Sequence, residues 1–170
     1  MIFVTVGTQL PFDRLVSAVD AWCARHPSVP VFGQIAEPGA GGYRPKHFPA
    51  EAFLSAARTT ELFERASLIV AHAGMGSIIS ALTLARPIVV MPRRFDLGEH
   101  RNDHQLATAR RLAAKPGITI VEDAESLARS FDTYHSKGRA IPHVPSLGPF
   151  AEPRLIDAIR SFAGLARPHL

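Results

Sequence analysis

Ser67-Leu68-Ile69-Val70-Ala71-His72-Ala73-Gly74-Met75-Gly76-Ser77 is the stretch of sequence that decides the fold. Its first five residues are mostly aliphatic, which is typical of a buried strand, and residues 78–85 after it predict a helix. Between them lie two glycines, a histidine and a serine placed to start the helix. A buried strand that leads through a glycine loop into a helix is the repeating unit of a parallel α/β sheet.

The same alternation continues in both directions along the chain. It predicts strands at residues 2–6, 31–36, 87–91 and 118–121, and helices at residues 12–23, 103–114 and 124–134, the last capped by Asp123. Residues 50–65 are less regular and predict one or two short helices with a turn near residues 58–60. We therefore expect a Rossmann-like α/β domain over residues 1–135, with three layers built on a parallel sheet.

The composition changes after residue 135. Residues 136–153 contain four prolines and two glycines, which predicts an extended connector. Pro153 then opens an amphipathic helix that has Leu155, Ile159, Phe162 and Ala166 on one side. This C-terminal segment, residues 136–170, is expected to dock either on its own sheet or on a partner subunit.

Composition and charge narrow the class of function. Hydrophobic residues make up 46% of the 170 residues, as expected of a globular protein with a core. The net charge is +4, but the arginines are scattered and no basic run is interleaved with aromatic residues, so we expect no nucleic-acid partner. A modest positive field suits a small anion such as a diphosphate.

Cys23 is the only cysteine, which excludes an intrachain disulfide and fits a reducing compartment. The N-terminus lacks the pattern of a secretory signal, and no apolar run approaches the roughly 20 residues that span a bilayer. We therefore expect a soluble cytoplasmic chain.

Two glycine-containing loops follow predicted strands, where ligands of open parallel sheets bind. Gly7 and Thr8 end the first strand, and a glycine there lets the backbone approach a phosphate closely, although an ordinary turn explains it too. In the second loop the candidate ligands of a phosphate are His72, Gly74, Gly76 and Ser77. Neither a Walker A motif nor Gly-x-Gly-x-x-Gly is present, and the alternative is a tight turn whose histidine bonds the backbone.

A third loop concentrates side chains that bind sugar hydroxyls and phosphates, namely Glu99, His100, Asp103, His104 and Gln105. One alternative is a solvated loop with Asp103 as a helix cap. Another is a zinc site, because His100 and His104 are four residues apart and lie beside two carboxylates. The His-Glu-x-x-His motif is absent, and we expect neither a metal nor a cofactor.

Together the three loops resemble the C-terminal, donor-binding half of the GT-B glycosyltransferases of family 28, over residues 1 to about 130. The resemblance is carried by Ile2 to Thr8 with Phe12-Asp13, Ser67 to Ser77, Pro92-Arg93, Gly98-Glu99-His100 and Asp103-His104-Gln105. It is greatest for the short stand-alone members, namely the exopolysaccharide subunits of the PssE type and the soluble subunit of the dolichol-linked N-acetylglucosaminyltransferase.

The resemblance implies a UDP-sugar-binding catalytic subunit of a two-component inverting glycosyltransferase in polysaccharide biosynthesis. It implies transfer of a hexose, glucuronic acid or N-acetylglucosamine to a lipid-linked acceptor, and Arg93 or Arg94 is a candidate partner for a glucuronate carboxylate. A membrane-anchored partner subunit would bind the acceptor and supply the general base. The chain alone is then expected to be inactive, and to be peripheral to the membrane through that partner.

One residue departs from the family pattern. Ser80 stands where the family usually carries a glutamate that holds the ribose hydroxyls. This departure favours an alternative function, a non-catalytic or regulatory module that binds nucleotide sugars. A sugar-nucleotide epimerase on the same fold would need a longer chain, and a zinc hydrolase would use His72, His100 and His104.

Overall fold

The computed structural model describes residues 1–136, 144–148, 157, 159, 161 and 162. Most of the helix predicted to begin at Pro153 lies outside the described residues, so that helix and the division of the chain at residue 135 stay predictions. Within the described part, no helix combines the length and the apolar character that crossing a bilayer requires.

Six parallel strands form one sheet in the order β3-β2-β1-β4-β5-β6. They are β1 (Ile2–Thr5), β2 (Val31–Gln34), β3 (Ala50–Glu51), β4 (Leu68–His72), β5 (Ile88–Met91) and β6 (Ile118–Ile120). The chain builds outward from β1 to β3 and then crosses back to β4, on the other side of β1. The strand order thus reverses between β1 and β4, and the carboxyl ends of these strands are where such sheets bind ligands.

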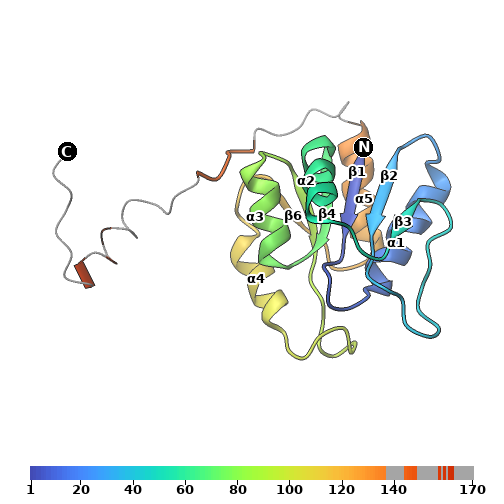
Figure 1. Cartoon of the computed structure of the whole chain (residues 1–170), viewed down its shortest axis with the longest axis horizontal. Helices are drawn as coiled ribbons and strands as arrows, with labels where there is room; N and C mark the ends of the chain where they lie inside the picture. Colours follow the sequence, from blue (N-terminus) through green and yellow to red (C-terminus); the bar gives the residue numbers. More distant parts are fainter. Residues whose placement is uncertain (137–143, 149–156, 158, 160, 163–170) are drawn as a thin grey trace.

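Helices cover both faces of the sheet, which confirms the three layers (Figure 1). α1 (Asp13–Arg25) and α5 (Ala124–Ser136) lie on one face, where Trp22 packs edge-on against Phe131 with ring centroids 4.9 Å apart. α2 (Ala56–Arg65), α3 (Met75–Thr83) and α4 (His104–Leu112) lie on the other, where Phe3 meets Phe63 at 5.3 Å. Each face therefore has its own apolar core.

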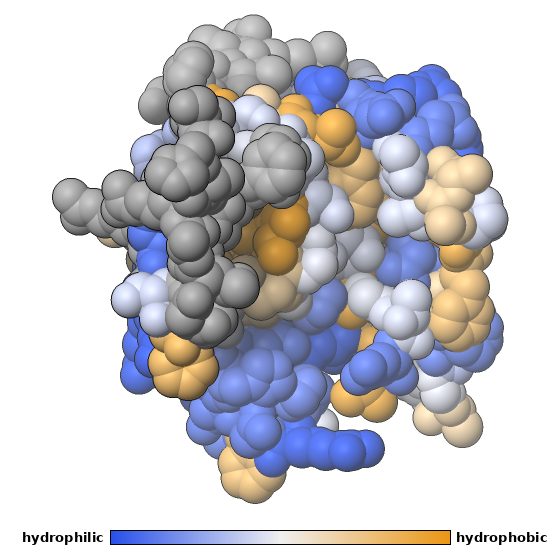
Figure 2. Space-filling view, turned by 60° about the vertical axis from the view of Figure 1, so that its left-hand side comes forward, coloured by the Kyte–Doolittle hydropathy of each residue, from blue (hydrophilic) through white to orange (hydrophobic). Residues whose placement is uncertain are grey.

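The outer face of α3 remains partly apolar. Met75 and Ile79 lie one turn apart on it, and each is about half exposed. Viewed from this side, the surface shows hydrophobic patches among hydrophilic side chains (Figure 2).

The prediction for residues 50–65 was right about a short helix and wrong about the turn. The segment begins with the two-residue edge strand β3, and residues 58–60 lie inside the single helix α2. Ser55 caps that helix, because its Oγ accepts a hydrogen bond from Arg58 N at 3.2 Å. β3 escapes prediction because Ala50 and Glu51 are poor strand formers, and their pairing with β2 is non-local.

The helix after the glycine loop also begins earlier than predicted. α3 starts at Met75 with Gly74 at the N-cap position, so Ser77 lies within the first turn and does not cap the helix. Gly74 has the extended backbone of an N-cap, φ −83° and ψ 130°, which lets the helix begin directly after it.

Candidate functional site

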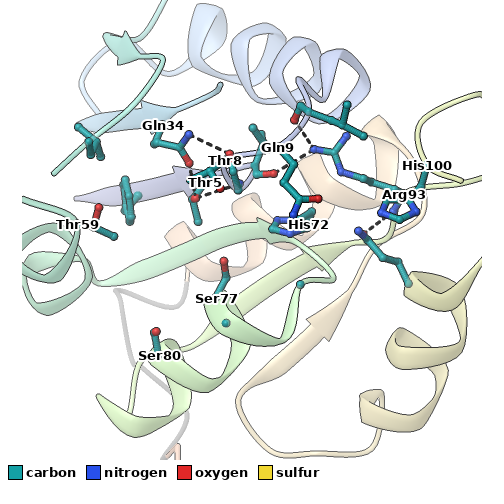
Figure 3. A pocket seen from close by; sticks show the side chains of 18 of the residues that line it. Thr5, Thr8, Gln9, Gln34, Thr59, His72, Ser77, Ser80, Arg93 and His100 are labelled. Atoms are coloured by element: carbon teal, nitrogen blue, oxygen red, sulfur yellow. Dashed lines mark hydrogen bonds between the residues drawn. The ribbon is translucent and has the colours of Figure 1, made fainter. Parts of the chain in front are cut away.

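A cavity of about 610 Å³ opens at the carboxyl ends of β1 and β4. The β1–α1 loop, the β4–α3 loop and the start of α4 enclose it (Figure 3). Nine of the eleven residues predicted from the sequence line it, namely Gly7, Thr8, His72, Gly74, Gly76, Ser77, His100, His104 and Gln105. Ser80 lines it as well, whereas Glu99 and Asp103 do not.

A buried glutamine holds the first loop in place. Gln34 Nε2 donates to the carbonyl of Gly7 at 3.0 Å and to that of Ala52 at 2.8 Å, and its Oε1 accepts from Thr5 Oγ1 at 2.8 Å. Gly7 has a φ of +79°, a conformation that favours glycine. The roles of Gln34 and Thr5 were not predicted. The available signal was a polar residue at the end of each of two largely apolar strands.

The imidazole of His72 packs between two glycines. A β carbon at Gly7 would lie 2.9 Å from His72 Cε1, and one at Gly74 only 2.2 Å from Nε2. At Gly76 a β carbon would meet nothing within 4 Å. Gly7 and Gly74 therefore make room for the histidine, whereas Gly76 leaves open space for a ligand.

His72 is a neutral hydrogen-bonding group at physiological pH. Burial, helped by the nearby charge of Arg93, lowers the pKa of its imidazole from 6.5 to about 4. Its Nδ1 makes no well-formed hydrogen bond in the described part of the chain, although an interaction of the ring with the Thr5 backbone partly opposes this lowering of the pKa. Burial and the neighbouring His104 also lower the pKa of His100. A neutral imidazole offers one donor and one acceptor, and a phosphate oxygen can take the donor.

Arg93 provides a fixed positive charge beneath the cavity. Its guanidinium donates to the carbonyls of Pro11 at 2.7 Å, Leu10 at 2.7 Å and Val6 at 3.0 Å. Burial lowers its pKa to about 10, so it remains charged at pH 7. The neighbouring Arg94 pairs with Asp96. Both arginines named as candidates for a glucuronate carboxylate thus have partners within the protein.

The two predicted carboxylates brace the third loop. Glu99 accepts two hydrogen bonds from Arg14, at 2.7 and 2.8 Å, and a third from Arg94 N at 2.9 Å. Asp103 stands at the N-cap position of α4, but its Oδ1 accepts from Phe95 N at 3.0 Å instead of capping the helix. These contacts hold the loop, and neither carboxylate reaches the cavity wall.

Gln105 joins the ends of two strands. Its buried Oε1 accepts from Ala73 N at 3.2 Å and from Arg93 N at 3.1 Å, the residues that follow β4 and β5 closely. No contact among the described residues occupies its Nε2. The amide nitrogen is therefore a hydrogen-bond donor at the cavity wall.

The N-terminus of α3 also faces the cavity. It has no side-chain cap and no acidic residue in its first turn, unlike α5, where Asp123 Oδ1 accepts from Ser126 N at 2.7 Å. Gly76 and Ser77, in that first turn, line the cavity. Unpaired backbone N–H groups and the positive end of the helix dipole make such a terminus a site for anions.

The histidines of the third loop contact each other and a neighbouring asparagine. The rings of His100 and His104 meet edge to face with centroids 4.5 Å apart, and His104 Nδ1 contacts Asn102 Oδ1. Across the residues that the structure describes, no three His, Cys, Asp or Glu side chains are grouped to hold a metal ion. The arrangement of these residues therefore gives no support to the zinc site that the sequence left as an alternative.

Comparison with known proteins identifies related sequences. A model of the glycosyltransferase family 28 C-terminal domain matches residues 1–139. The human UDP-N-acetylglucosamine transferase subunit ALG13 is 33% identical over 118 residues, which cover 65% of this chain and 10% of that protein. The chain thus spans about a tenth of the length of this relative.

Solved structures share the fold at low sequence identity. An NMR structure of ALG13 matches with a TM-score of 0.58 at 17% identity, over 93% of both chains. A putative UDP-N-acetylglucosamine 2-epimerase from Listeria monocytogenes matches with a TM-score of 0.63 at 16% identity, over 98% of this chain and 46% of that one. Both transferase and epimerase structures therefore contain this α/β architecture.

Proposed function

The chain belongs to the family of glycosyltransferase family 28 C-terminal domains, and we propose that it is the UDP-sugar-binding subunit of a two-component glycosyltransferase. The observation that carries this proposal is the uncapped N-terminus of α3 at the cavity where the strand order reverses. A diphosphate fits that position because backbone N–H groups and the helix dipole both favour negative charge there.

The residues around this helix terminus complete a cradle for a leaving diphosphate. His72 and the Gln105 amide add neutral donors, and Arg93 supplies a fixed charge below them. Groups that are already oriented stabilise the charge that develops on UDP without rearranging during the reaction. We therefore assign the stabilisation of this negative charge to groups of the protein, without a metal ion.

The contacts of Arg93 and Arg94 favour a neutral donor sugar, a hexose or N-acetylglucosamine. Neither arginine is available to a glucuronate carboxylate, because the Nη atoms of Arg93 bind backbone carbonyls and Arg94 pairs with Asp96. His104 is exposed at the cavity and is placed to contact a sugar hydroxyl.

The acceptor and the catalytic base belong to a membrane-anchored partner subunit. Inverting transfer joins an acceptor hydroxyl to the anomeric carbon, releases UDP and passes the hydroxyl proton to a base. No Asp or Glu occurs among the described residues that line the cavity, and its most buried histidine, His72, already packs between glycines. We therefore assign the base to the partner, which presents a lipid-linked saccharide.

Exposed apolar side chains near the carboxyl ends of the strands support the need for a partner. Leu10, Phe53, Phe95 and Leu97 lie in segments that follow strands and Met75 begins α3, and these side chains are 43–57% exposed. Exposed apolar side chains gathered at one edge of a sheet favour a surface that another protein covers. The chain would then act at the cytoplasmic face of a membrane, in polysaccharide biosynthesis.

A second function is a regulatory module that binds nucleotide sugars without taking part in catalysis. Ser80 favours it, because its hydroxyl is a weaker acceptor for ribose than a carboxylate. A turnover assay in the presence of the partner distinguishes the catalytic subunit from the regulatory module. The catalytic subunit is required for transfer when the partner is present, whereas a regulatory module only changes the rate.

Titration calorimetry of the purified chain with UDP tests the binding step. We expect one binding site, weakened several-fold in His104→Ala and unchanged in His135→Ala, a control on the exposed end of α5. Transfer of labelled sugar from UDP-sugar to a lipid-linked acceptor should require both the chain and its partner. Turnover by the isolated chain would contradict the two-component proposal, and absence of UDP binding would contradict the assignment of the site.

A further inference from the structure

Two serines on α3 lie one helical turn apart along the cavity. Figure 3 shows the side chains of Ser77 and Ser80 on the cavity side of α3, with Thr59 on the α2 side and with Arg93 and His100 at the opposite end. Ser77 belongs to the first turn of the helix, and Ser80 is about 4.5 Å further along the axis.

The two ends of the cavity differ in character. Phe63 lines the cavity from α2, one helical turn from Thr59, and with Leu54, which precedes that helix, it offers an apolar wall on the α2 side that suits the flat face of a base. The imidazoles of His100 and His104 line the other end and suit hydroxyl groups. If the diphosphate binds at the N-terminus of α3, as the proposed function requires, the ribose between phosphate and base lies beside Ser80.

The wall around this position contains no charged acceptor. Each residue that lines the cavity is described by the structure, and none of them is Asp or Glu. Two of the nearby hydroxyls are already engaged, because Thr59 Oγ1 donates to the carbonyl of Ser55 at 3.0 Å and Thr5 Oγ1 donates to Gln34. No contact between described residues occupies the hydroxyls of Ser77 and Ser80.

A neutral serine discriminates poorly between a ribose and a deoxyribose. A hydrogen bond between neutral groups changes affinity by about tenfold or less, whereas one to a carboxylate is roughly twice as strong. Water can replace the lost partner, because the cavity opens to solvent. Loss of the 2′-hydroxyl therefore costs the complex little.

We propose that this cavity accepts 2′-deoxyribonucleoside diphosphates nearly as well as ribonucleoside diphosphates, and that Ser80 sets this tolerance. The inference rests on the proposed nucleotide-sugar function and extends its substrate class to sugars carried on deoxyribonucleotides. The inference is drawn from the cavity wall beside α3, which carries hydroxyl groups and no carboxylate.

Calorimetric titration of the full chain with UDP and with 2′-deoxy-UDP tests the proposal. We expect the two dissociation constants of the wild type to differ by less than about tenfold. In Ser80→Glu the preference for UDP should rise at least about tenfold, because the new carboxylate accepts a hydrogen bond from the 2′-hydroxyl. Comparing the two nucleotides within each variant cancels the repulsion between this carboxylate and the diphosphate.

Ser136→Glu is the matched control, since Ser136 is exposed at the end of α5 and lies outside the cavity. It should keep the wild-type ratio. If Ser80→Glu binds neither nucleotide or fails to fold by circular dichroism, Ser80→Gln replaces it and should raise the UDP preference by a smaller factor. A wild-type preference for UDP above tenfold, or an unchanged ratio in a Ser80 variant that binds UDP, would overturn the inference. Failure of the wild type to bind either nucleotide would instead overturn the proposed function.

Discussion

The side chain of His72 occupies the space that a β carbon at Gly74 would need, 2.2 Å from its Nε2. Gly7 lies on the other side of the ring, where a β carbon would be 2.9 Å from Cε1. Two loops from neighbouring strands therefore close on one imidazole. The first role of these two glycines is therefore to leave space for the side chain of His72. They affect the ligand site indirectly, because they fix the position of that histidine.

Alanine substitutions separate the two glycines of the β4–α3 loop. Gly74→Ala should lower the free energy of unfolding by about 1–3 kcal/mol and weaken UDP binding, because the new methyl group displaces His72. Gly76→Ala meets open space inside a helix, so it should stabilise the fold by up to about 1 kcal/mol. Urea denaturation and UDP titration of both variants measure these effects. Equal stability of the two variants would contradict the packing role of Gly74.

The low pKa of His72 predicts a loss of stability in acid. Its imidazole titrates at 6.5 in a free chain and at about 4 in the fold. Between these values the unfolded chain binds a proton that the folded chain does not, so the free energy of unfolding falls as the pH falls from 6.5 to 4. At about 1.4 kcal/mol for each pKa unit, the loss approaches about 3 kcal/mol.

The comparison with His72→Asn isolates this contribution from those of other groups. Urea denaturation at pH 7.0, 5.5 and 4.5 should show the wild type losing more stability than the variant at each acidic step. Between pH 7 and 8 the two slopes should agree, because His72 is neutral in both states. Parallel losses throughout the acidic range would show that His72 is not buried as a neutral group.

Parts of the site could be predicted because the fold brings strand ends together. Each apolar run ends in a polar or glycine loop, and parallel strands place those loops at one edge of the sheet. That reasoning found His72 and His104 although 31 positions separate them in the printed sequence. The short strand β3 was missed, because two residues carry no periodic pattern.

The direction of individual side chains could not be predicted. Glu99 and His100 are neighbours in the sequence, yet Glu99 binds Arg14 while His100 lines the cavity. Arg93 was one candidate partner for a glucuronate carboxylate, but its partners are backbone carbonyls, which every residue carries and no motif marks. Such roles depend on which loops meet, and only the assembled fold determines that.

Removal of Glu99 should loosen the β5–α4 loop. Its carboxylate accepts three hydrogen bonds, and its side chain is 13% exposed. Glu99→Ala should therefore lower the free energy of unfolding by about 1–3 kcal/mol, since Arg14 loses its charged partner. Glu125 pairs with Arg129 on the surface of α5, and Glu125→Ala should be indistinguishable from the wild type. Amide hydrogen exchange should show faster exchange in the loop for Glu99→Ala only.

Arg93 should be irreplaceable even by lysine. The side chain is 2% exposed, and its two Nη atoms serve three carbonyls of the β1–α1 segment while the guanidinium lies over the Phe12 ring, 4.4 Å from its centroid. A lysine ammonium is a compact charge that cannot span the same three acceptors or stack on the ring, so at least one buried carbonyl would lose its partner. Arg93→Lys should therefore lower the free energy of unfolding by about 2–4 kcal/mol.

The neighbouring arginine supplies the control for this substitution. Arg94 pairs with the exposed Asp96, so Arg94→Lys keeps the charge at the surface and should leave the urea midpoint unchanged. Arg93 also holds the β1–α1 loop beside the cavity, so Arg93→Lys should weaken UDP binding as well. This loss of affinity should persist at temperatures where the variant is fully folded. A lysine variant with wild-type stability and UDP affinity would mean that the positive charge alone, and not the fork of the guanidinium, holds the two loops together.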